Sequence, residues 1–148
     1  MNTTYFLNCV AGNLFHTKEN PAIPAQYYIG LSSSTPAIDG SGVNEPSTDA
    51  GYQRLLLTNL SEPVDGLVSN EQDINFDEST ANWGTITHYV IYDSPTADDG
   101  NLLMFGELST PRSVETATIM TIKSGYKWPR TPTPWLPFGT AKVWGRGT

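Results

Sequence analysis

The chain has 148 residues, a formal net charge of −7, 38% hydrophobic residues and 16% charged residues. This length suits one domain with an arm. No apolar run approaches about 18 residues, which excludes a membrane-spanning helix, and the first residues do not have the pattern of a secretory signal. The single cysteine, Cys9, excludes an intramolecular disulfide and a cysteine-rich zinc module, and the acidic excess argues against general nucleic-acid binding.

Residues 3–16 have the spacing of an amphipathic helix. Phe6, Val10 and Leu14 recur at intervals of four residues, with Leu7 and Ala11 beside them. Thr3 or Thr4 can cap the start of this segment. The sequence therefore predicts one short N-terminal helix with a single apolar stripe.

The remainder of the body is typical of β structure. Short segments rich in β-branched and aromatic residues alternate with loops that contain Gly and Pro. The predicted strands are residues 26–32, 52–58, 70–77, 85–93, 101–108 and 113–123. We expect Pro36 and Pro111 each to end a strand.

The segment 85–93 is apolar on both faces, which is typical of a central strand that is covered on both sides. Residues 101–108 follow closely enough to form a hairpin with it. The imperfect alternation of residues 113–123 allows a bulge there. The fold class predicted from these elements is mainly β, an antiparallel β-sandwich or partly closed barrel with a short N-terminal helix and an extended C-terminal arm.

Charge is distributed unevenly along the chain. Residues 1–122 hold 15 acidic and 3 basic side chains, whereas residues 123–148 hold 5 basic side chains, no acidic ones, three of the four tryptophans and four prolines. We therefore predict a body over 1–123 and an arm over 124–148. The arm is expected to dock on an acidic, apolar surface of a neighbouring copy or of another protein. The alternative is that the arm folds back on its own body. The predicted interface residues are Lys127, Trp128, Arg130, Trp135, Phe138, Trp144 and Arg146.

His88 is the first candidate for catalysis, because Asp93 lies near it in the sequence. A Ser-His-Asp arrangement needs an activated nucleophile within hydrogen-bond reach, and the chain contains no G-x-S-x-G elbow. A histidine inside an apolar strand is more often a hydrogen-bonded structural residue. We therefore predict no catalytic role for His88.

Acidic residues cluster in Asp98-Asp99-Gly100 and again at Asp73, Asp77 and Glu78. Such carboxylates can bind calcium or serve a glycosidase, but neither stretch has the spacing of an EF-hand loop. Asp-Asp-Gly also favours a solvated turn by its own chemistry. The turn is the favoured interpretation, and the sequence predicts no metal, no cofactor and no enzymatic activity.

Three further residues are interpreted as determinants of the fold. Arg54 can pair with a carboxylate of the body, Trp83 is expected to pack over a sheet edge, and Gly84 is expected to let the backbone approach closely.

The order of five segments resembles that of small virion proteins of tailed bacteriophages. These segments are YYIGLSSSTP at 27–36, GYQR at 51–54, INF at 74–76, ANWGTITHYVIYD at 81–93 and GNLLMFGELSTPRSV at 100–114, which follow the N-terminal helix. Such proteins are commonly described as tail fibre, minor tail or decoration-type proteins, and the resemblance spans roughly residues 3–123.

The resemblance implies a non-enzymatic structural component of a tailed-phage virion, located in the virion after assembly in the bacterial cytoplasm. The implied partners are a second copy of the chain and other virion proteins, with neither nucleic acid nor membrane. The alternatives are a capsid decoration protein and a module that binds a host-surface glycan or receptor.

Overall fold

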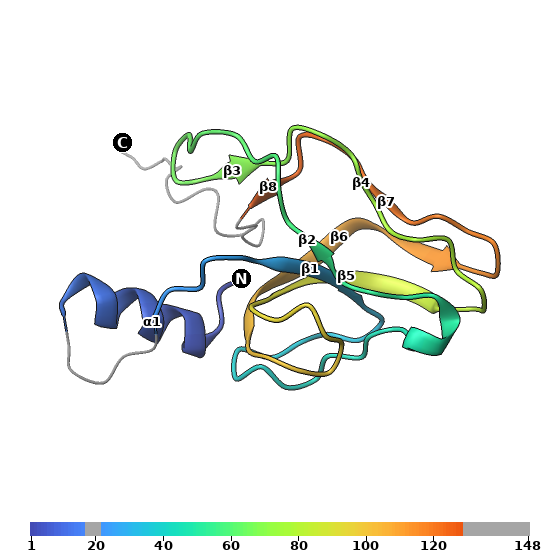
Figure 1. Cartoon of the computed structure of the whole chain (residues 1–148), viewed down its shortest axis with the longest axis horizontal. Helices are drawn as coiled ribbons and strands as arrows, with labels where there is room; N and C mark the ends of the chain where they lie inside the picture. The colour runs from blue at the N-terminus through green and yellow to red at the C-terminus, as the bar shows by residue number, and fades with distance from the viewer. Residues whose placement is uncertain (17–21, 129–148) are drawn as a thin grey trace, which may run out of the picture.

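The computed structural model describes residues 1–16 and 22–128, and they form a mainly β fold with one short N-terminal helix (Figure 1). The elements are α1 (Thr4–Leu14), β1 (Tyr28–Ser32), the 3-10 turn η1 (Thr48–Ala50), β2 (Leu55–Leu56), β3 (Val68–Ser69), β4 (Ile74–Asn75), β5 (Gly84–Tyr92), β6 (Leu102–Val114), β7 (Thr121–Ile122) and β8 (Lys127–Trp128). The mainly β, antiparallel prediction is confirmed, and the strands of the described residues do not close into a barrel.

The strands form one larger sheet and two small ones. The larger sheet has the order β2-β1-β5-β6, while β3 pairs with β8 and β4 pairs with β7, all antiparallel. β5 lies between β1 and β6, and Leu31 of β1 is opposite Tyr89 of β5. The prediction that this strand is central and forms a hairpin with the following strand is confirmed.

The helix is present as predicted, but its apolar stripe points away from the body. Thr3 is the N-cap, and its Oγ1 accepts a hydrogen bond from the backbone N–H of Phe6 at 3.3 Å. The buried residues of α1 are Cys9 and Gly12, which are small and allow the helix to lie close to β6. Leu7, Val10 and Leu14 are 51%, 38% and 66% exposed.

β6 continues through Pro111, so the prediction that this proline ends a strand is wrong. β6 is an edge strand of its sheet, and proline is tolerated at an edge because no neighbouring strand requires its missing N–H. At the other end of β6, the N-terminal residues lie along the same outer edge. The backbone N–H of Thr3 donates to the carbonyl of Leu103, and that of Phe105 donates to the carbonyl of Met1.

The bulge lies in a different place from the one expected. The register between β5 and β6 shifts between Ile86 and His88, not within 113–123. The extra residues lie on β6, where residues 108–111 stand opposite Thr87 alone. The segment 113–123 is instead divided between the end of β6 and β7.

Two apolar clusters cover the two faces of β5. The smaller cluster contains Val90, Tyr92, Leu102 and Phe105. The larger cluster contains Ile29, Leu31, Ala50, Tyr52, Phe76, Trp83, Ile86, Tyr89, Ile91, Val114, Met120, Ile122 and Trp128. The indole N–H of Trp83 donates to the carbonyl of Ala50 at 2.9 Å. Gly84 has φ +80°, and a Cβ at this position would have open space around it, so the glycine serves the backbone conformation and not the close approach that we expected.

Candidate interface

The root of the predicted arm is part of the body. Lys127 and Trp128 form β8, in which Trp128 is opposite Val68 and Lys127 is opposite Ser69 of β3. The β structure therefore extends beyond residue 123, where the sequence placed the start of the arm. The other predicted interface residues, Arg130, Trp135, Phe138, Trp144 and Arg146, lie outside the described residues.

Trp128 is buried in the core of its own chain, with 2% of its surface exposed. Its ring makes an edge contact with Tyr89 at 4.6 Å between centroids and a tilted contact with Tyr126 at 5.0 Å. Trp128 therefore packs on the body of its own chain, and its side chain is not available to a partner. Its buried Nε1 has no hydrogen-bond partner among residues 1–16 and 22–128.

Asn70 fixes the segment that leads to the arm. Its side-chain Oδ1 accepts a hydrogen bond from the backbone N–H of Tyr126 at 2.8 Å, and its Nδ2 donates to the carbonyls of Gln72 and Lys123 at 2.8 and 3.0 Å. Its own carbonyl accepts from the N–H of Gly125 at 2.7 Å. Because Asn70 is 1% exposed, these bonds are shielded from water and hold residues 123–126 on the body.

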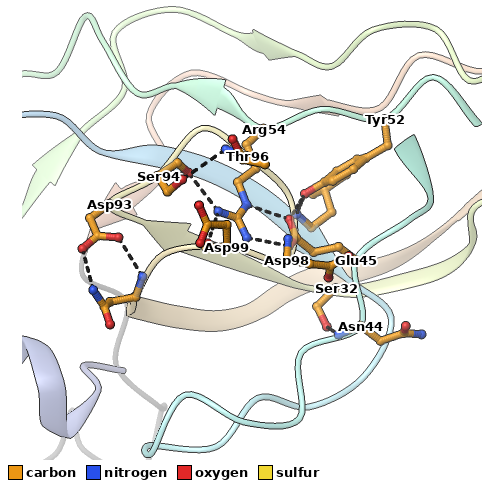
Figure 2. Close-up of polar contacts among 12 residues, drawn as sticks. Ser32, Asn44, Glu45, Tyr52, Arg54, Asp93, Ser94, Thr96, Asp98 and Asp99 are labelled. Atoms are coloured by element: carbon orange, nitrogen blue, oxygen red, sulfur yellow. Dashed lines mark hydrogen bonds and ion pairs between the residues drawn. The ribbon is translucent and has the colours of Figure 1, made fainter. Parts of the chain in front are cut away.

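A buried ion pair joins the loops next to the main sheet (Figure 2). Nε and Nη2 of Arg54 donate to the two carboxylate oxygens of Glu45 at 2.9 and 2.7 Å, and the two side chains are 0% and 1% exposed. Nη1 of Arg54 donates to the carbonyls of Ser94 and Asp99 at 2.9 and 2.8 Å. The sequence correctly suggested a carboxylate partner for Arg54, but no pattern singled out Glu45.

Two tyrosines complete this network. The hydroxyl of Tyr52 donates to Oε1 of Glu45 at 2.5 Å and accepts from the N–H of Leu31 at 3.0 Å, and the guanidinium carbon of Arg54 lies 3.6 Å from the centroid of the Tyr92 ring. Every charged group of the network is therefore paired and hydrogen-bonded, which is the condition under which buried charges are tolerated. The network thus links Glu45, Tyr52 and Arg54 to the loop at 94–99.

The ionisation of the network follows from these contacts. Burial raises the pKa of Glu45, but the hydrogen bonds from Arg54 and Tyr52 outweigh burial and hold the pKa below its ordinary value. Burial and the neighbouring Glu45 carboxylate raise the pKa of Tyr52 well above its ordinary value, so its hydroxyl stays protonated. The pair is thus ionised over the neutral range.

His88 is buried, and its Nδ1 lies 2.8 Å from the hydroxyl of Thr87. Burial lowers the pKa of His88 below its ordinary value, which favours the neutral ring. Asp93 is engaged elsewhere: its carboxylate accepts from the N–H and the Nδ2 of Asn101 at 2.7 and 3.0 Å. The structure therefore does not assemble the catalytic arrangement that was considered for His88 and Asp93.

The clustered carboxylates are exposed, and those of Asp73 and Asp77 bond to segments that are distant in the sequence. Asp73 accepts from the N–H of Ser124 at 2.8 Å and from Lys123 at 3.4 Å, and Asp77 accepts from Gln53 at 2.6 Å. Asp98 has a positive φ of 61°, which Asp adopts more readily than most residues. Within residues 1–16 and 22–128, no group of three or more His, Cys, Asp or Glu side chains is placed to hold a metal ion.

A hollow of about 450 Å³ lies between the first turns of α1, residues 39–43 and residues 98–102. Its lining includes Tyr5 and Tyr92 together with Asp39, Asp98 and Asn101. Ser41 donates two hydrogen bonds to Asp39 and thereby lowers the pKa of this carboxyl. The hollow is thus lined by aromatic, acidic and amide residues.

The described residues contain no helix that is both long and apolar enough to cross a membrane. Residues 2–126 match the family described as Podophage GP4 fiber I protein gp80. The chain belongs to this podophage fibre family. No curated protein matches the chain. The family match covers most of the sequence and ends within the segment that Asn70 holds, two residues before Trp128.

Membership of this fibre family makes the chain a structural component of the phage tail-fibre type. It also places the chain in the virion, in association with other virion proteins. The resemblance to tailed-phage virion proteins is confirmed at this level.

Proposed function

We propose that the chain is a non-enzymatic subunit of a podophage tail fibre that assembles through its β body and its C-terminal arm. The observation that carries this proposal is that the arm begins from a fixed root. Asn70 and β8 hold residues 123–128 on the body, and the family match ends at residue 126. The sequence that follows lies beyond the family match, which suits a segment that selects a partner.

Charge supports the same proposal. Residues 1–16 and 22–128 carry 14 acidic and 4 basic side chains, and one of the basic ones, Arg54, is buried in its ion pair. The segment 129–148 is basic and rich in aromatic residues. Opposite charges favour and orient the docking of such a segment on a neighbouring acidic body, whereas buried aromatic and arginine side chains usually supply most of the binding energy.

In this proposal the docking residues are Lys127, Arg130, Trp135, Phe138, Trp144 and Arg146, and Trp128 is the fixed root of the arm. The contact is either with a neighbouring copy or with another fibre protein. A role as a capsid decoration protein would use the same arm on a different acceptor.

Light scattering of the full-length chain at about 0.15 M and about 1 M salt tests the arm contact between copies. Raising the salt shortens the Debye length from about 8 Å to about 3 Å, so an assembly that depends on the arm weakens. Trp135→Ala with Trp144→Ala should weaken it at both salt concentrations. An assembly that responds to neither the salt nor the two substitutions would contradict the proposal.

A second candidate function is recognition of a host-surface glycan, and the hollow beside Tyr5 and Tyr92 favours it. Aromatic rings can stack on sugar rings, and Asp39, Asp98 and Asn101 can bond to sugar hydroxyls. A glycan array probed with the full-length chain and with Asp98→Asn tests this function. Specific signals that Asp98→Asn reduces would support it, and the absence of any signal would count against it.

A further inference from the structure

We propose that residues 129–138 of the arm dock, as an extended polyproline segment, in the hollow beside α1 of a neighbouring copy. This hollow, whose lining includes Tyr5, Tyr92, Asp39 and Asp98, is here called the α1 hollow. The inference rests on the proposed arm contact and deepens it, because it names the surface that accepts the arm. Its evidence is the charge of the α1 hollow, the spacing of apolar residues in the arm and the separation of the two by the main sheet.

The α1 hollow is acidic. Among the described residues that line it, Asp39 and Asp98 alone are charged at neutral pH, and both are exposed. Neither belongs to an ion pair within residues 1–16 and 22–128. Residues 129–148 carry three basic and no acidic side chains. Carboxylates without a counter-charge attract such a segment, whereas a neutral sugar gains nothing from their charge, so the arm is favoured over a glycan as the occupant.

The polar groups of the α1 hollow are held in place by the body. The backbone N–H of Asp98 donates to Oε2 of Glu45 at 3.2 Å, so the buried ion pair positions this turn (Figure 2). Asn101 is fixed by its two bonds to the carboxylate of Asp93, and Asp39 is fixed by its two bonds from Ser41. A site whose groups are already ordered loses less conformational entropy on binding. The α1 hollow is therefore preorganised to accept a ligand.

The arm has apolar residues at regular intervals of three. These residues are Pro129, Pro132, Trp135 and Phe138. Closely spaced prolines favour the polyproline conformation, which has three residues per turn, so the four side chains are expected to share one edge. Arg130, the only charged residue of this segment, is next to that edge. Proline-rich segments bind to grooves lined by aromatic residues, and the α1 hollow supplies two tyrosines and two carboxylates for such an edge.

The root of the arm and the α1 hollow belong to opposite faces of the main sheet. Trp128 packs on Tyr89 in the larger apolar cluster, whereas Tyr92 and Leu102, which line the α1 hollow, belong to the smaller cluster on the other face of β5. To reach its own hollow, the arm would have to pass around an edge of the sheet. A neighbouring copy offers its hollow without this detour. Each copy then gives one arm and accepts one, which forms a ring if the rotation closes and an open chain if it does not.

Mixing two complementary variants tests this docking. The arm variant carries Arg130→Gln with Trp135→Ala, and the hollow variant carries Tyr5→Ala with Asp98→Asn. In sedimentation velocity at about 0.15 M salt, the wild-type chain should form an oligomer. Each variant should raise the dissociation constant by about 10-fold or more, because an aromatic contact and an ion pair are lost. At a concentration where each variant alone is monomeric, an equimolar mixture should form a heterodimer and nothing larger, because it contains one intact arm and one intact hollow for each pair.

Leu7→Ala with Asp65→Asn is the matched control for the hollow variant. Leu7 is an exposed residue of α1, and Asp65 is exposed with a positive φ of 53°, close to the 61° of Asp98. Neither residue lines the α1 hollow. The control shortens one side chain of the helix and removes one charge, and it should leave the oligomer unchanged. The thermal midpoint of each variant, followed by circular dichroism, shows whether the body is folded.

The outcomes separate the α1 hollow from the arm contact itself. If the arm variant dissociates the oligomer and the hollow variant does not, the arm contact stands and the α1 hollow is overturned as its acceptor. An oligomer that neither variant weakens overturns the arm contact between copies and the α1 hollow together. A mixture that forms no heterodimer overturns the head-to-tail docking. A chain that is monomeric at every concentration also overturns it, and a glycan-array signal that the hollow variant abolishes would then assign the hollow to a glycan.

Discussion

Replacing Glu45 by glutamine tests how much the buried ion pair stabilises the fold. Glu45 accepts hydrogen bonds from the hydroxyl of Tyr52, from two nitrogens of Arg54 and from the N–H of Asp98. The variant keeps the size of the side chain but leaves the buried guanidinium without its counter-charge. Breaking such a pair costs about 3–5 kcal/mol, which corresponds to a fall in the melting temperature of roughly 6–20 °C for a chain of this size.

Urea denaturation of Glu45→Gln, Arg54→Met and the double variant measures this loss. The double variant should be less destabilised than the sum of the two single variants, because neither buried charge is then left alone. Asp77→Asn is the control, since Asp77 is exposed and bonds only to Gln53 among the described residues; it should change the unfolding free energy by less than about 1 kcal/mol. A Glu45→Gln variant within about 1 kcal/mol of the wild type would refute the reasoning.

Acidification should also destabilise the fold, because the pKa of Glu45 in the folded chain lies below its ordinary value of 4.5. The contribution of the ionised carboxylate to the unfolding free energy is present above pH 4.5 and is lost as the pH falls through the folded-state pKa. Denaturation curves measured over a pH series should therefore show a weaker pH dependence of the unfolding free energy in Glu45→Gln than in the wild type. Asn70→Ala should cost about 2–4 kcal/mol in urea denaturation, because several buried backbone groups lose their partner; a loss below about 1 kcal/mol would contradict the account of the arm root. Gly106→Ala should cost about 1–3 kcal/mol in thermal melts, because a Cβ there would lie 2.6 Å from the hydroxyl oxygen of Tyr89, and the cost should shrink in a Tyr89→Leu background. Trp128→Ala should cost about 3–5 kcal/mol in the same melts, as expected for a core residue, whereas a surface arm residue would cost almost nothing.

Local patterns in the sequence predicted the elements that have strong local signals. The Thr3 cap, the length of α1 and the central position of the strand over 85–93 are confirmed because capping chemistry and two-sided apolarity are local properties. The orientation of α1 was not predictable in the same way. Periodicity identifies the apolar stripe, but it does not say whether this stripe faces the chain's own body or another molecule.

Long-range polar contacts account for the remaining differences. Residues 52–54 look like a strand, yet β2 is limited to Leu55–Leu56, because Tyr52 and Arg54 make their bonds to Glu45 and to the loop at 94–99. Asn70 sits in an ordinary polar stretch, and its partners Lys123 and Tyr126 lie more than fifty residues away. No local pattern marks a residue whose role depends on such distant partners.

The path of β6 through Pro111 bears on how a fibre subunit avoids unwanted growth. Within the described residues, β6 has a paired strand on one side only, and an open strand edge is a template on which further chains can add without limit. Met1–Thr3 cover the beginning of this edge, and Pro111 withholds a hydrogen-bond donor farther along it. An edge that is covered at one end and interrupted by a proline offers fewer hydrogen-bonding groups to an added strand, which disfavours sheet-to-sheet polymerisation.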